Sequence, residues 1–63
     1  MKLKIVIEMD NAAFADDPHG EPARIMRHAA KVIEQGAFGM SPGANMPLRG
    51  VNGNLVGKAE VRE

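Results

Sequence analysis

Apolar and polar side chains alternate along residues 2–9, which is the period of a β-strand with one buried face. The expected inner face carries Leu3, Ile5, Ile7 and Met9. The opposite face carries Lys2, Lys4, Val6 and Glu8. The pattern therefore predicts a first strand over about residues 2–9.

Residues 10–20 are rich in Asp, Asn, Pro and Gly and lack any apolar period, which is typical of a loop. One helical turn is expected over Asn11 to Phe14. Phe14 is the only large apolar side chain of this segment, so we expect it to pack back against the core.

From about residue 21 to residue 35 apolar side chains recur at steps of three and four, so they form one stripe of an α-helix. The stripe consists of Ile25, Met26, Ala29, Val32 and Ile33. Pro22 suits the first turn of this helix, and Gly36 suits its C-terminal cap. A single amphipathic helix is predicted.

Residues 36–47 hold three Gly and two Pro and show no period, which predicts a long, mobile connection. The segment from about 48 to 61 contains Asn52-Gly53 between apolar flanks, the signal of a two-residue hairpin turn. That turn would set Gly50 opposite Leu55 and Leu48 opposite Gly57.

This register assigns the side chains of the hairpin to two faces. One face would hold Leu48, Leu55, Ala59 and Val61. The other would hold Arg49, Val51, Asn54, Val56, Lys58 and Glu60.

The predicted architecture is one small α+β domain over residues 1–63, with the order β-α-β-β. Its three-stranded, mainly antiparallel sheet carries one helix on one face. We expect the third strand between the first and the second. A parallel pairing of the first two strands through a right-handed crossover is the alternative.

One helix covers one face of a sheet, and the uncovered face would carry Val6, Val51 and Val56. A chain of 63 residues buries a small core, and without cysteine no disulfide reinforces it. We therefore expect these valines to mediate self-association into a dimer or tetramer. The alternative is that they are ordinary surface residues of strands.

Eight basic residues balance eight acidic ones, and no apolar run approaches the ~20 residues of a membrane span. A protein of the cytoplasm without a membrane partner is predicted. The acidic segment with Asp16, Asp17, His19 and Glu21 lacks the spacing of known calcium loops. Ser41 is the only serine, and no nucleophile arrangement can be defended. We expect no enzyme activity, catalytic residue, metal site or cofactor.

The polar side of the helix carries a row of cations made by Arg24, Arg27, His28 and Lys31. Such a row is able to contact phosphates, so a small nucleic-acid-binding protein is the alternative function. A net charge of zero and the lack of exposed aromatic side chains for base stacking favour a simple solvated helix face.

Three segments, Asp10 to Phe14, Glu21 to Gly36 and Leu48 to Gly57, resemble a group of short bacterial and prophage proteins without an assigned activity. The resemblance spans most of the chain and implies a phage or mobile-element setting, with no functional residues to carry over. The expected function is a non-enzymatic protein-interaction module, a homo-oligomer that binds a host protein as a phage or prophage accessory.

Overall fold

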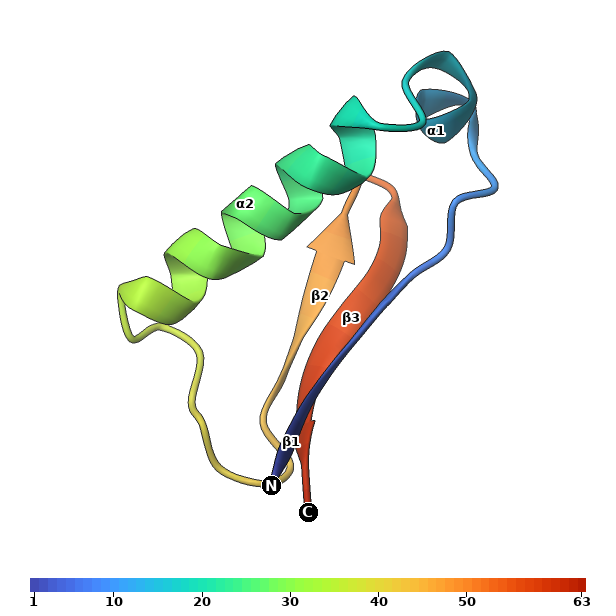
Figure 1. Cartoon of the computed structure of the whole chain (residues 1–63). Coiled ribbons are helices and arrows are strands. Elements are labelled where there is room, and N and C mark those ends of the chain that lie inside the picture. The colour runs from blue at the N-terminus through green and yellow to red at the C-terminus, as the bar shows by residue number, and fades with distance from the viewer.

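Five elements follow one another in the computed structural model, which describes all 63 residues. They are β1 (Lys2–Ile7), α1 (Ala12–Asp16), α2 (Gly20–Glu34), β2 (Asn45–Arg49) and β3 (Leu55–Arg62). Figure 1 shows α2 lying across one side of the three strands, with α1 beyond its N-terminal end. The α+β prediction is confirmed.

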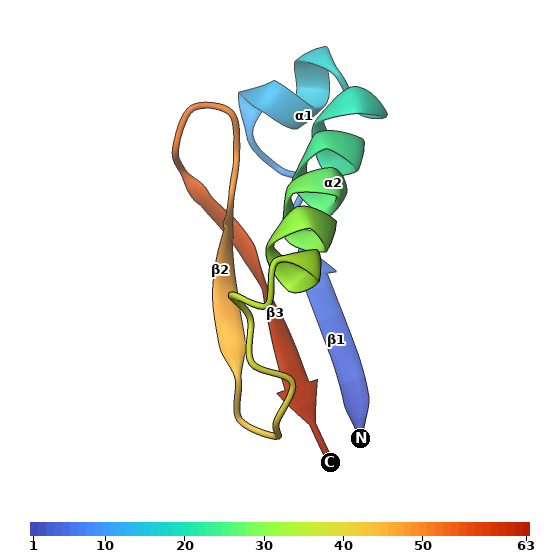
Figure 2. The same ribbon diagram turned by 90° about the vertical axis from the view of Figure 1, so that its left-hand side faces the viewer.

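The sheet has the strand order β1-β3-β2, and both pairings are antiparallel. Figure 2 shows β3 between its two neighbours. The prediction that the third strand is central is confirmed, and the parallel alternative is wrong. β1 and β2 are therefore the two edge strands.

α2 forms the second layer by packing its apolar stripe against the inner face of the sheet. The buried residues at the centre of this contact are Phe14, Ile25, Ala29, Leu48 and Val56. Met26 was expected in the stripe but is 44% exposed, so the buried stripe is narrower than the spacing suggested. No helix or strand forms a covering layer on the opposite face of the sheet (Figure 1).

The helix ends in the way its sequence predicts. Gly36 has a φ of +73°, a left-handed conformation that glycine adopts without steric cost. Its N–H donates to Ile33 O, and the N–H of Ala37 donates to Val32 O. These two bonds are the Schellman motif, which satisfies carbonyls that the last turn leaves free.

The loop after β1 contains a short helix, α1, which is one residue longer than the predicted turn and begins one residue later. Asn11 caps α1 by accepting a hydrogen bond of 3.0 Å from the Ala13 N–H to its Oδ1. α1 turns Phe14 inward, where it is almost completely buried. The predicted packing of Phe14 against the core is confirmed.

The Gly/Pro connection is shorter than predicted, and part of it packs against the core. Phe38 is buried against Ala59 and Val61, and β2 already begins at Asn45. Pro47 is tolerated inside β2 because hydrogen-bonded residues alternate along an edge strand. Ala44 O accepts from the Val61 N–H, so Pro47 lies at a position that faces away from β3.

The hairpin turn differs from the predicted two-residue turn. Gly50 N–H donates to Asn54 O at 2.8 Å, so three residues form the loop. Only Gly53 has a positive φ, +84°, whereas the predicted turn requires a positive φ at Asn52 as well. A three-residue loop with glycine in the left-handed position is the next most common hairpin connection.

A β-bulge at Val56 compensates for this longer turn. Arg49 pairs with Leu55, but the next pair is Leu48 with Gly57, so Val56 has no partner on β2. The predicted register is thus correct beyond the bulge and wrong between the bulge and the turn.

The bulge also reverses which side chains point inward. Val56 is only 5% exposed and belongs to the core, whereas Leu55 is 63% exposed. The predicted outward position of Val56 and inward position of Leu55 are both wrong, because a bulge shifts the alternation of side chains by one residue.

Gly57 allows β1 and β3 to approach each other beside the bulge. A Cβ atom at this position would overlap the carbonyl oxygen of Val6. Since this neighbour is backbone, it is unable to move without displacing β1.

We therefore expect Gly57→Ala to lower the free energy of unfolding by about 1–3 kcal/mol, the usual cost of overpacking. Urea denaturation followed by circular dichroism measures this loss. Gly39→Ala is the control, because its Cβ would meet only Ala44 Cβ at 4.0 Å, and it should change stability by less than about 0.5 kcal/mol. Equal stability of the two variants would contradict the close approach.

Candidate functional site

The face of the sheet opposite α2, called the outer face below, is left without a covering layer by the fold. Cross-strand pairing arranges its side chains in rows: Lys2 lies beside Arg62, Lys4 beside Glu60, and Val6 beside Lys58. β2 extends the last two rows with Asn45 and Pro47. The outer face therefore combines cations with a few apolar side chains.

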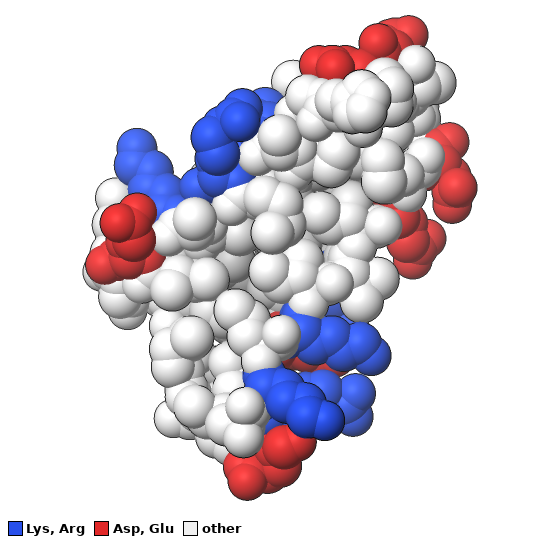
Figure 3. Space-filling view, viewed as in Figure 1, with Lys and Arg blue, Asp and Glu red and all other residues white.

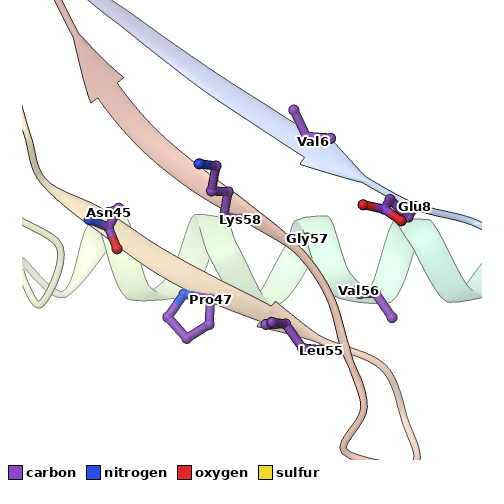
Figure 4. A pocket seen from close by; sticks show the side chains of 8 residues that line it. All are labelled: Val6, Glu8, Asn45, Pro47, Leu55, Val56, Gly57 and Lys58. Atoms are coloured by element: carbon purple, nitrogen blue, oxygen red, sulfur yellow. The ribbon is translucent and has the colours of Figure 1, made fainter.

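A hollow of about 580 Å³ lies on this face beside the bulge. Figure 4 shows Pro47 and Leu55 on the side of the sheet away from the helix, with Val6 across β3 from them. Glu8, Asn45 and Lys58 supply polar groups around these apolar side chains. A hollow with an exposed leucine and a polar rim is suited to contact with another protein.

Charged groups on the outer face partly neutralise one another. Glu60 lies 3.6 Å from Lys58 Nζ and 3.9 Å from Arg62 Nη1. Both cations remain about 60% exposed, so these pairs contribute little to stability. Figure 3 shows blue and red atoms close together in the lower part of the molecule, and mostly red at its opposite end.

The three valines predicted to mediate self-association do not lie together. Val6 is on the outer face and 40% exposed. Val51 is 69% exposed but lies in the hairpin turn, near α1 and the start of α2. Val56 is in the core. The outer face instead presents Leu55 and Pro47. The residue pattern does not predict this arrangement, because it carries no signal of the bulge.

The cationic row of α2 is interrupted by an ion pair. Arg24 Nε lies 3.0 Å from Glu21 Oε1, and its Nη2 donates to Arg49 O at 3.3 Å. The row therefore consists of Arg27, His28 and Lys31, which are exposed. One of its four predicted members has a structural role instead.

Glu21 is the buried carboxylate of the molecule, and it connects α2 to the hairpin turn. Its Oε2 accepts a 2.8 Å hydrogen bond from the Val51 N–H, thirty positions along the chain. The bonds from the Arg24 guanidinium, together with this backbone bond, lower the pKa of Glu21 below its ordinary value of 4.5. Two donors thus compensate the carboxylate for its loss of water.

The other acidic residues do not converge on a cation site. No group of three or more His, Asp or Glu side chains lies close enough to hold a metal ion. Asp17 accepts a hydrogen bond from the Gly20 N–H at 2.9 Å, and Glu21 is occupied as described. The acidic segment serves the start of α2.

No helix is long and apolar enough to cross a membrane. No protein-family model matches the chain, and neither a curated protein nor a solved structure matches it. The geometry of the outer face is therefore the basis for the functional proposal.

The pKa of Glu21 predicts how stability depends on pH. Because this pKa is lowered by folding, the stabilisation is present above about pH 4.5 and is lost as the pH falls through the lower pKa of the folded state. We expect Glu21→Gln to be less stable than the parent protein at pH 7, and the difference to shrink on acidification. Urea denaturation at several pH values measures this.

Glu34→Gln is the matched control, since Glu34 is exposed and forms no ion pair. The free energy of unfolding of Glu34→Gln should match that of the parent protein at every pH. A stability difference between Glu21→Gln and the parent that stays constant from pH 7 to about pH 3 would contradict the assigned role of Glu21.

Proposed function

We propose that this protein is a non-enzymatic protein-interaction module that works as a homo-oligomer in the cytoplasm, with the outer face of its sheet as the contact surface. The observation that carries the proposal is Leu55, a large aliphatic side chain that is 63% exposed beside Val6 and Pro47 at an open hollow. Stacking two outer faces would remove these groups from water.

The energy scale supports association through this face. Burying one leucine or valine contributes about 1.5–3 kcal/mol. In a two-fold symmetric contact the same residues of both copies are buried, so each contribution counts twice. Because a core of this size supplies only about 3–5 kcal/mol, such a contact would matter for the whole fold.

An alternative interpretation is that the cations serve a nucleic acid. Both aromatic residues, Phe14 and Phe38, are buried, so no ring is available for base stacking. Glu60 lies among the outer-face cations, and Arg24 is bound to Glu21. These contacts favour a protein partner.

We also propose that the protein belongs to a phage or prophage setting. The resemblance to short prophage proteins supports a role as an accessory protein that binds a host protein. In that role the host protein would bind a surface that stays exposed after the outer faces have stacked.

We expect Leu55→Asp to lower the mass measured by light scattering, because a carboxylate on the contact surface is costly to bury. Two substituted sites for each stacked pair should weaken association at least about a hundredfold. Circular dichroism should remain unchanged, since Leu55 is outside the core.

Met26→Asp is the control, because Met26 is an exposed apolar residue on α2. This variant should keep the mass of the parent protein. Identical masses for the parent protein and Leu55→Asp would contradict stacking through the outer face. DNA or RNA binding that weakens with salt and is lost in an Arg27→Glu/Lys31→Glu variant would favour the nucleic-acid alternative.

A further inference from the structure

The edges of the sheet differ in their protection against pairing. β2 has five residues and carries Pro47, which lacks an N–H. β1 has six residues without Pro or a bulge, and no strand pairs with its outer edge. A regular edge strand without Pro or a bulge is a template for another strand.

The backbone groups on the free edge of β1 belong to the odd-numbered residues. The Glu8 N–H donates to Val56 O, so Glu8 and the other even-numbered residues face β3 in the antiparallel ladder. Leu3, Ile5 and Ile7 direct their N–H and C=O groups away from the sheet. These are the groups that an added strand would bind.

The sequence from β1 into the three residues that follow it, residues 2–10, is complementary to its own reverse. Around Val6, Lys4 on one side corresponds to Glu8 on the other, and Lys2 corresponds to Asp10. The apolar positions match in the same way, with Ile5 opposite Ile7 and Leu3 opposite Met9. An antiparallel second copy centred on Val6 thus pairs every charge with an opposite one.

We propose that two copies of the protein pair through their β1 edges, antiparallel and centred on Val6, to form one continuous six-stranded sheet. Ile5 of one copy exchanges backbone hydrogen bonds with Ile7 of its partner. The two Val6 residues form a non-hydrogen-bonded pair on the two-fold axis, which agrees with the bonding pattern of β1.

Exposed apolar side chains at this edge also fit the proposal. Leu3 is 42% exposed and Met9 is 48% exposed, although both alternate onto the side that α2 covers. In the paired sheet, Leu3 meets Met9 of the partner, and both lose exposed surface. Neither Leu3 nor Met9 would be in the contact that forms when two outer faces stack.

Charge selects this register among the available ones. A shift by one residue would mix the two faces of the sheet, which a half-buried strand does not tolerate. A shift by two toward the start of β1 would centre the pair on Ile5 and set Lys4 opposite Val6. Only the register centred on Val6 gives acidic partners to both Lys4 and Lys2. These partners are Glu8 and Asp10, in the segment that follows β1.

Charge reversal tests the register in a Leu55→Asp background, which removes the stacked contact and leaves edge pairing alone. The Leu55→Asp protein itself should be dimeric by sedimentation equilibrium. Lys4→Glu and Glu8→Lys should each weaken the dimer about tenfold or more, since each places like charges opposite each other twice. An equimolar mixture of the two variants should recover the dimer, because every pair in the mixed dimer is attractive.

Lys31→Glu and Glu34→Lys on α2 are the matched controls, and neither should change the dimer. A cysteine substitution adds a geometric test, because the chain has no cysteine. Non-hydrogen-bonded partners lie about 4.5 Å apart between Cα atoms, within disulfide range. Val6→Cys should therefore cross-link to itself, and Lys4→Cys should cross-link only to Glu8→Cys.

The results separate this inference from the proposed function. A monomeric Leu55→Asp protein, a mixture that does not recover the dimer, or a mass that rises only with added DNA or RNA would overturn edge pairing. A Leu55→Asp protein with the mass of the parent and sensitivity to Lys4→Glu would support edge pairing and contradict stacking.

Discussion

The bulge at Val56 determines what the sheet presents to the core and to solvent. It lets a three-residue turn coexist with the register of the remaining hairpin, and it moves Val56 into the core while it moves Leu55 out. Gly57 follows directly and lets the β1 backbone come close. The hydrogen bond from Glu8 to Val56 O then ties the bulge to β1. The apolar character of the outer face depends on this local irregularity.

Glu21 has a comparable role at the other layer. Its carboxylate accepts bonds from the side chain of Arg24 and the backbone of Val51, so the start of α2 is bound to the hairpin turn. Arg24 adds a bond to Arg49 O. These contacts hold the end of the hairpin near the helix while the outer face stays open. Rigid strands present a contact surface at lower entropic cost than mobile ones.

Most of the fold could be predicted from the period of apolar residues. Three features were sufficient to predict the main elements and most of the side chains that face the core. They are the alternation in β1, the apolar stripe of α2, and Gly36 at the end of that helix. The turn could not be predicted because Asn52-Gly53 is compatible with loops of two and three residues. Because of that difference of one residue, Val56 is predicted on the outer face, as part of the self-association site, although it is buried in the core. The role of Glu21 could be predicted only in part: Arg24 is three residues away on the same helix, but Val51 is thirty positions distant.

The order of the strands has a consequence for how the chain folds. Both edge strands need β3, and β1 finds its partners between Gly57 and Arg62, whereas it begins at Lys2. These contacts join residues that are far apart in the sequence, so a long loop must close before β1 gains any hydrogen bond. Topologies with many such contacts fold more slowly than those with mostly local contacts. A nascent chain that lacks β3 is expected to have helical segments without tertiary structure, and its uncovered apolar residues would be accessible to chaperones.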